Sequence, residues 1–174
     1  MSEAKLITYD PNIHNKKIYH IFEEYRDWFL TGFKANTNKE FFQASGLTLS
    51  GYEDSIEHFL NLKPPKGSLL LVEIDKEIAG MGVIHKIGEN TGEVKRMFTL
   101  QKFRRRGIAR KILNGLMDVG SDLGCTRFLL DSPSWAHSSH GLYLSSGFNI
   151  VEEYPESEIP TKVRQYWIFM EKKD

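Results

Sequence analysis

The sequence has little of what marks a redox-active, secreted, membrane or nucleic-acid-binding protein. Cys125 is the only cysteine among 174 residues, which excludes a disulfide framework and a cysteine metal cluster. Lysine plus arginine and aspartate plus glutamate number 23 each, so there is no basic excess to attract nucleic acid or a membrane surface. No apolar run approaches the ~18 residues of a membrane span, and we expect no signal segment. These absences predict a cytoplasmic protein with no nucleic-acid and no membrane partner.

Internal repeats and low-complexity tracts are also absent, and what remains is typical of a single globular domain. An apolar content of 40% is ordinary for a folded chain. The length suits one domain with a substantial core. We therefore expect residues 1–174 to form one unit.

The first 66 residues have mainly helical periodicity. Apolar residues recur on one face between residues 14 and 30 and again between residues 53 and 62, where Pro64 and Pro65 end the pattern. Residues 6–9 have the composition of a short strand. The stretch between the two helical patterns has no clear period, and we expect it to be irregular.

Strand-like segments dominate from residue 68 onward. The expected strands are 68–74, 78–87, 93–100, 127–131, 148–153 and 165–171. An apolar stripe with a period near 3.6 predicts a helix from Ile108 to Leu123, capped by Gly124. A second, short helix is expected at 135–146, closed by Gly147. Because a strand, a helix and a strand follow one another at 93–131, two strands should pair in parallel there. The expected fold class is α/β, with a mixed α+β sheet that carries helices on both faces and is not a doubly wound Rossmann sheet.

The segment from Arg104 to Ala109 lies at the start of the striped helix and has the composition of a phosphate site. A helix N-terminus exposes unpaired backbone N–H groups and carries a partial positive charge. Gly107 lets the backbone come close to a ligand, and the arginines before it add charge. A solvated basic loop or a nucleic-acid patch is the alternative interpretation. The zero net charge and the position of Gly107 at the helix start both weigh against it.

Two motifs resemble those of the GNAT acyltransferases. One runs from Lys95-Arg96-Met97-Phe98-Thr99 into Arg104-x-x-Gly107-x-Ala109, and is similar to the family's Arg/Gln-x-x-Gly-x-Gly/Ala signature. The other, Gly141-Leu-Tyr-Leu-Ser-Ser-Gly-Phe148, is similar to the family's Leu-Tyr-x-x-x-Gly-Phe. A single Gly-rich turn is weak evidence, but two motifs with a strand between them are much stronger. The resemblance covers residues 68–154 and implies the GNAT acyl-CoA N-acyltransferase fold, a central twisted, mostly antiparallel sheet with helices on both faces.

The resemblance implies acetyl-CoA as the co-substrate. It divides the chain into acceptor-side helices at 1–66, an acetyl-CoA-binding core at 68–154, and an acceptor loop with the last strand at 155–174. The residues it assigns to the cofactor are Met97, Phe98, Thr99, Arg104, Arg105, Arg106, Gly107, Ile108, Ala109 and Arg110. One departure concerns an Asn that the family often has near the start of the second helix. This chain has Ala136-His137-Ser138-Ser139 there.

Tyr143 and Glu93 are the catalytic candidates. Tyr143 matches the tyrosine that protonates the departing CoA thiolate in the family, and the alternative is a half-buried core tyrosine. Glu93 lies six residues before Thr99, and an even separation in a strand puts both on one face. That spacing resembles the general base of the histone-type branch. Alternatively, Glu93 is a carboxylate at a hairpin end that pairs with Lys95, and water relays the proton.

The resemblance predicts N-acetyl transfer to a primary amine of a small molecule, by direct attack in a ternary complex. A protein lysine or N-terminus as the acceptor, and a non-catalytic CoA-binding regulator, are the alternatives. A homodimer is left open, because family members often form dimers.

Two acidic groups are candidates for binding the acceptor amine. Glu23, Glu24 and Asp27 cluster with Tyr25 and Trp28, although a charged outer helix face explains them equally. Glu156 and Glu158 lie in the loop before the last strand, where solvent exposure is the alternative.

A metal site is not expected. His137 and His140 lie one helical turn apart, but no third ligand accompanies them.

Overall fold

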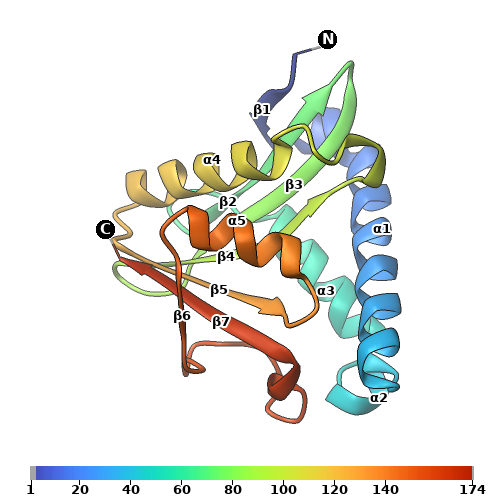
Figure 1. The fold of residues 1–174 in the computed structure, drawn as a ribbon. Coiled ribbons are helices and arrows are strands. Elements are labelled where there is room, and N and C mark those ends of the chain that lie inside the picture. Colours follow the sequence, from blue (N-terminus) through green and yellow to red (C-terminus); the bar gives the residue numbers. More distant parts are fainter. Residues whose placement is uncertain (1–2, 174) are drawn as a thin grey trace.

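The computed structural model describes residues 3–173, whose helices cover both faces of one sheet (Figure 1). The strands are β1 (Lys5–Thr8), β2 (Gly67–Ile74), β3 (Glu77–Lys86), β4 (Thr91–Thr99), β5 (Arg127–Pro133), β6 (Asn149–Val151) and β7 (Trp167–Lys173). The α-helices are α1 (Pro11–Thr37), α2 (Phe41–Ser45), α3 (Leu49–Leu60), α4 (Ile108–Asp122) and α5 (His137–Ser145).

The helix α1 is longer than the sequence predicts. It begins at Pro11, whose fixed φ suits a first turn, and Asp10 caps it by accepting a hydrogen bond from the Asn12 backbone N–H at 2.8 Å. It ends at Thr37, before Asn38 in the left-handed conformation with φ 57°. The helix prediction at 14–30 was therefore too short.

The stretch between the two predicted helices is not irregular, because it contains the end of α1, the short α2 and the start of α3. Phe33 lies one helical turn beyond Phe29 and continues the apolar face of α1. Together with Phe41, it packs with Trp167 and Phe169 in a second apolar cluster, next to the main core. Gly32, Asn36 and Thr37 are poor helix formers, which is why this part of α1 looked irregular in the sequence.

The sheet has seven strands in the order β1-β2-β3-β4-β5-β7-β6. The strands β4 and β5 pair in parallel, and every other neighbouring pair is antiparallel. The predicted mixed, mostly antiparallel sheet with a parallel crossover at 93–131 is thus confirmed.

Helices pack on opposite faces of this sheet. On one face, Gly82 of β3 makes room for α4, since a Cβ there would lie 2.6 Å from Cγ2 of Ile112. The helix α5 lies beside α4, where Arg110 donates from Nη2 to Oγ of Ser145 at 2.9 Å. On the other face, aromatic rings of α1 pack against Phe98 of β4. The predicted helices on both faces are confirmed.

The strand β4 carries a bulge at Arg96. Lys95 pairs with Val83, whereas Phe98 pairs with Met81, so β4 has one more residue than β3 in this interval. Arg96 has φ 54°, an uncommon backbone conformation for a residue other than glycine. A bulge bends its strand and changes the direction of the side chains that follow it.

The bulge overturns the prediction that Glu93 and Thr99 share a face. Glu93 pairs with His85 and Thr99 with Gly80. His85 and Gly80 are an odd number of residues apart on β3, so they point to opposite faces. Glu93 therefore lies on the side of α1, and Thr99 lies on the side of α4. The inserted residue breaks the alternation on which the sequence argument depended.

Candidate active site

The parallel strands β4 and β5 part in the middle of the sheet. Residues Thr91–Val94 pair with Arg127–Leu130, and no pairing between these strands continues beyond Val94 in the described chain. Beyond that point β5 follows β7 as far as Pro133, and β4 follows β3. The separation leaves backbone groups of both strands without a sheet partner, and two cavities lie around it.

The first of these, the donor cavity, lies between the end of β4, the start of α4 and α5, and has a volume of about 530 Å³. Its walls are formed by Trp28, Met97, Phe98, Thr99, Phe103, Arg104, Arg105, Gly107, Ile108, Ala109, Arg110, Ser138, Ser139, Leu142 and Tyr143. Every residue that the family resemblance assigned to the cofactor lines this cavity except Arg106. The guanidinium of Arg106 lies over the ring of Phe103, at 5.5 Å.

The start of α4 presents free hydrogen-bond donors to the donor cavity. Arg105 and Gly107 both have positive φ, at 63° and 73°, and the first helical bond runs from the Lys111 N–H to the Gly107 carbonyl at 3.0 Å. Among residues 3–173, the backbone N–H groups from Arg105 through Arg110 have no acceptor. Unpaired N–H groups, the helix dipole and nearby arginines together suit a phosphate group.

Tyr143 lies where the donor cavity meets the second cavity, and it lines both of them with Trp28, Met97 and Ser139. Its side chain is buried, and its hydroxyl has no hydrogen-bond partner in the described part of the chain. Burial raises the pKa of Tyr143 above its ordinary value, with smaller contributions from Tyr25 and Asp131. The phenol therefore carries its proton at neutral pH.

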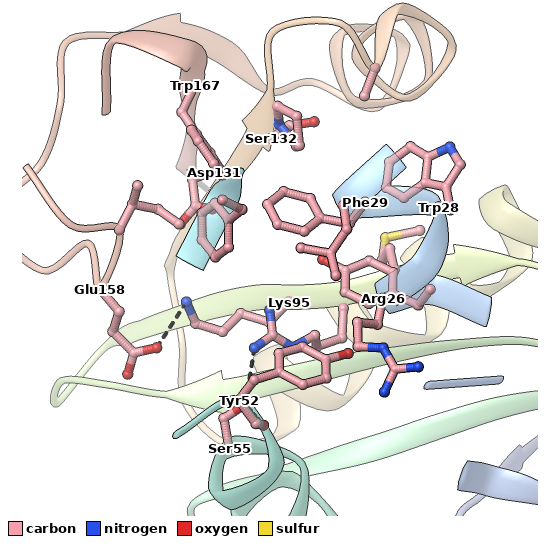
Figure 2. A pocket seen from close by; sticks show the side chains of 18 of the residues that line it. Arg26, Trp28, Phe29, Tyr52, Ser55, Lys95, Asp131, Ser132, Glu158 and Trp167 are labelled. Atoms are coloured by element: carbon pink, nitrogen blue, oxygen red, sulfur yellow. Dashed lines mark hydrogen bonds and ion pairs between the residues drawn. The ribbon is translucent and has the colours of Figure 1, made fainter. Parts of the chain in front are cut away.

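The second cavity, called the acceptor cavity below, has a volume of about 300 Å³ (Figure 2). Segments from α1, α2, α3, β4, β5, α5 and the loop before β7 surround it. Its aromatic lining consists of Tyr25, Trp28, Phe29, Phe41, Phe42, Tyr52, Tyr143 and Trp167.

Charged side chains lie among these aromatic walls. Lys95 is held between two carboxylates, with Nζ 3.2 Å from Oε2 of Glu93 and 3.2 Å from Oε2 of Glu158 (Figure 2 shows the second contact). Arg26 pairs with its neighbour Asp27 at 3.0 Å. These two cations of the cavity wall therefore have carboxylate partners.

Arg96 lines the acceptor cavity without such a partner. Its guanidinium lies 5.4 to 5.7 Å from the ring centres of Tyr25, Tyr52 and Phe59, and it donates from Nη2 to Oγ of Ser55 at 3.1 Å. Its Nε is buried and has no hydrogen-bond partner. The sequence analysis quoted this residue only as part of a motif and gave it no role.

Asp131 is a site residue that the sequence analysis missed. It lines the acceptor cavity beside the strand separation, and its Oδ2 is buried with no hydrogen-bond partner. Burial raises the pKa of the Asp131 carboxyl, and the charges of Lys95 and Arg96 oppose the rise. A signal was present, because Asp131 ends a short apolar strand, and ligands of α/β proteins bind at the carboxyl ends of strands.

Glu93 lines neither cavity. Its side chain is 1% exposed and lies beneath Lys95, and the Tyr154 hydroxyl donates to its Oε1 at 3.4 Å. Burial raises the pKa of Glu93 to about 7, although Lys95 lowers it. The pairing with Lys95 that sequence offered as the alternative is present, and the pKa nevertheless suits proton exchange near neutrality.

The two predicted acidic groups differ in position. Glu23, Glu24 and Asp27 are exposed and line neither cavity, whereas their aromatic neighbours Tyr25 and Trp28 line the acceptor cavity. The acids thus belong to an outer helix face.

The loop before β7 brings one of its two candidate acids to the site. Glu156 pairs with Arg127 at 2.7 Å, and Glu158 lines the acceptor cavity through its contact with Lys95. On the donor side, Ser138 and Ser139 line the cavity in the region where the family often has Asn.

The strand separation, the exposed N–H groups of α4 and the joined cavities define the class of fold. It is the GNAT acyl-CoA N-acyltransferase fold, a mixed α/β sheet with helices on both faces. A model of the Acetyltransferase (GNAT) family matches residues 18–148, and the chain belongs to this family.

Two proteins with similar sequences are also described as N-acetyltransferases. An uncharacterized N-acetyltransferase of Escherichia coli (strain K12), YedL, is 30% identical over 55% of this chain, and one of Bacillus subtilis (strain 168), YsnE, is 31% identical over 56%. These matches span 61% and 63% of the length of the two relatives.

Among solved structures, the PaiA N-acetyltransferase from Thermoplasma acidophilum in complex with coenzyme A has a TM-score of 0.73 at 14% identity, covering 99% of both chains. An acetyltransferase from Streptococcus agalactiae has a TM-score of 0.69 at 19% identity, covering 98% of both chains. At these identities the likeness concerns the fold.

Residues 3–173 lack two features of other protein classes. No helix there is long and apolar enough to cross a membrane. No group of three or more His, Cys, Asp or Glu side chains there is arranged to hold a metal ion.

Proposed function

We propose that this protein is an acetyl-CoA-dependent N-acetyltransferase that acetylates the primary amine of a small molecule by direct attack in a ternary complex. One observation carries the proposal: a cavity with unpaired N–H donors at a helix start joins an aromatic cavity at Tyr143. A two-substrate reaction needs such a junction, where one ligand enters from each side.

The donor cavity suits coenzyme A. The N–H groups from Arg105 through Arg110 would hold the pyrophosphate, and Arg104 would add charge. Met97, Phe98 and Thr99 border the strand separation, where their backbone would pair with the pantetheine arm. A methyl group on Gly107 would meet nothing within 4 Å, so the space in front of this turn is open to a ligand.

Acetyl-CoA supplies the acetyl group when bound: the amine nitrogen bonds to the acetyl carbon, the carbon–sulfur bond breaks, and the sulfur leaves with the bonding electrons. The amine must first lose a proton, because an alkylammonium with a pKa of about 10.4 has no lone pair. The protein therefore has to accept one proton and supply another.

Tyr143 is the proposed general acid. Its hydroxyl lies at the junction of the cavities, its raised pKa keeps it protonated, and no protein acceptor among the described residues competes for its proton. A positioned acid typically contributes ~10²–10⁴-fold to the rate.

Two carboxylates are proposed for the amine proton. Asp131 can accept it directly, since it lines the acceptor cavity and burial raises its pKa. Glu93 is the residue that its spacing suggested, but it lies outside the cavity. It would need a relay through Tyr154, which donates to it, or through water.

A small acceptor is supported by the walls of the acceptor cavity. A peptide lysine would favour an open groove, whereas segments from α1, α2, α3 and the loop before β7 surround this cavity. The same lining also weakens the case for a CoA-binding regulator, because such a protein needs no second cavity at the thioester.

The test is release of free thiol from acetyl-CoA by the purified protein with a panel of small amines. We expect acetyl-CoA-dependent release with at least one primary amine, and none with the matching N-acetylated amine. CoA binding without release for any amine would instead support a regulator, and release only with peptides would support a protein acceptor.

A further inference from the structure

The charges of the acceptor cavity do not all pair within the protein. Lys95 forms a salt bridge with Glu158, and Arg26 forms one with Asp27. Arg96 and Asp131 line the same cavity, and neither makes an ion pair with any residue among 3–173. Each of the two feels the charge of the other, and Tyr154 donates a hydrogen bond to Asp131, but neither has a salt bridge. One cation and one anion therefore remain without a direct ionic partner and can take one from a ligand.

The buried guanidinium of Arg96 is energetically unfavourable without a counter-ion. A guanidinium has five N–H donors, yet Arg96 has hydrogen-bond partners only in the hydroxyls of Ser55 and Tyr25, and its Nε has none. Burying a charge without a counter-ion is unfavourable, and the left-handed backbone at Arg96 adds strain. Strain and an unpaired charge at one residue are typical of ligand sites, since bound ligand supplies the missing partner.

The carboxylate of Asp131 likewise lacks a partner for one of its oxygen atoms. Oδ2 of Asp131 is buried without a hydrogen-bond donor, and the carboxylate lies at the strand separation, where the amine must be for transfer. Much of the remaining lining of the cavity is aromatic. At about 300 Å³ the cavity is at the small end of ligand pockets and suits a small ligand.

Resting on the proposed acetyl transfer, we propose that the acceptor is a zwitterion: a primary amine that also carries a carboxylate and one aromatic or branched apolar group, the chemistry of an apolar amino acid. Arg96 binds the carboxylate, and Asp131 binds the ammonium group. A carboxylate is preferred over a phosphate because one unpaired guanidinium balances one negative charge, and Glu158 and Asp131 would repel a dianion.

The experiment uses ligand pairs that differ only in the carboxylate: phenylalanine and phenethylamine, tryptophan and tryptamine, leucine and isoamylamine. Binding to the CoA-loaded protein is measured by calorimetry, and thiol release is measured in parallel with acetyl-CoA. We expect the carboxylate-bearing member of at least one pair to bind about tenfold or more tightly, because a charge-assisted bidentate pair is lost in the other member.

The variant Arg96→Gln should remove this preference, weakening the carboxylate ligand about tenfold and its partner less than about threefold. Arg96→Lys should restore part of it, because the charge returns without the planar donors. Arg127→Gln is the matched control, since this arginine is half-buried, pairs with Glu156 and Glu171, and lines neither cavity. It should leave the preference unchanged.

Several results would overturn the inference. Equal or tighter binding of the amines that lack a carboxylate would do so, and so would no binding by any carboxylate-bearing amine. Equal weakening of both members by Arg96→Gln would mean that Arg96 only holds α1 and α3 against β4. Arg96-dependent binding without any thiol release would leave the ligand class standing and reject acetyl transfer. Thiol release only from amines that lack a carboxylate would support acetyl transfer and reject the zwitterionic acceptor.

Discussion

Tyr143 combines three properties of a proton donor: it lies at the junction of the cavities, it is buried, and its hydroxyl has no partner in the described chain. Each follows from α5, which ends near Gly147 and packs Tyr143 against Phe148 with ring centres 6.1 Å apart. The contact orients the ring, so removing the hydroxyl alone should leave the packing intact.

Tyr143→Phe should lower kcat by ~10²–10³ while the affinity for CoA stays nearly constant, because only the proton donor is lost. Steady-state kinetics and calorimetry measure the two effects. Tyr19→Phe is the control, since that tyrosine donates to Glu57 on the surface and lines neither cavity. Full turnover by Tyr143→Phe would reject the acid role.

Asp131 and Glu93 can be separated by isosteric amides. We expect Asp131→Asn to lower kcat/KM by ~10²-fold or more at neutral pH, with activity recovering as the pH approaches the pKa of the amine. Glu93→Gln should lower it less than about tenfold, because Glu93 lies outside the cavity. pH–rate profiles of both variants give the answer. A larger loss in Glu93→Gln would assign the base to Glu93 and a relay.

Glu93 should also make stability depend on pH. Its pKa is raised from 4.5 to about 7 in the folded protein, so the folded state binds the proton more tightly than the unfolded state. The contribution of Glu93 to the free energy of unfolding is then fully present below about pH 4.5, and it is lost as the pH rises through about 7. The full loss is on the order of 3 kcal/mol.

Urea unfolding at pH 5 and pH 8 checks this. Glu93→Gln should lose less free energy of unfolding between these pH values than the parent protein. Glu158→Gln, which removes the exposed partner of the same lysine, should reduce the loss much less, because Glu158 contributes least to the pKa of Glu93 and burial contributes most. Identical pH dependence in the parent protein and Glu93→Gln would show that the Glu93 carboxylate stays ionised throughout.

At the scale of elements, α4 shows how packing positions the residues of a proposed binding site. Its apolar stripe packs on β3, where Gly80 and Gly82 leave room, and this packing aims the helix start at the strand separation. The proposed phosphate binding therefore depends on the direction of a whole helix as much as on the turn itself.

Gly107→Ala should weaken CoA binding about tenfold, because alanine disfavours φ 73° by roughly 1–2 kcal/mol and relaxation would turn the N–H groups away. Gly124→Ala is the matched control: it has φ 82° at the other end of α4, away from both cavities. Both variants should unfold at lower temperature, but only Gly107→Ala should lose CoA affinity. Equal affinities would show that the turn does not hold the phosphates.

The bulge in β4 is the element that sequence could not reveal. The segment Glu93 to Thr99 alternates well enough to predict a regular strand, and nothing local marks Arg96 for a left-handed backbone. The extra residue shows only in the register against β3, where Lys95 pairs with Val83 and Phe98 with Met81, and in the aromatic rings that surround the Arg96 guanidinium. For that reason the face of Glu93 was mistaken while the strand itself was correct.

At the scale of the whole molecule, the donor cavity draws on β4, α4, α5 and one residue of α1, Trp28. A ligand that bridges these elements must stabilise the fold, since it binds the native state alone.

CoA at about 100 times its Kd should add about 2.7 kcal/mol to the free energy of unfolding. For a chain of this size that raises Tm by roughly 5–10 °C. Differential scanning fluorimetry measures it, with ATP as the control, because ATP has the phosphates but no pantetheine arm and should give a smaller shift. Equal shifts would mean that the cavity binds nucleotides without using the strand separation.

The sequence by itself determined the mixed sheet, the parallel crossover and the turn from Arg104 to Ala109, because each depends on local periodicity or on residues close together in the chain. Tyr143 could be named as the candidate acid for the same reason, because it lies in a short motif. Only the tertiary structure decided which face Glu93 occupies, that Asp131 and Arg96 have no salt bridge among the described residues, and that the aromatic rings of α1 and α2 line one cavity. Those properties arise when distant segments pack together and exclude water, and a charge in such a place acquires its role from neighbours that the linear pattern does not contain.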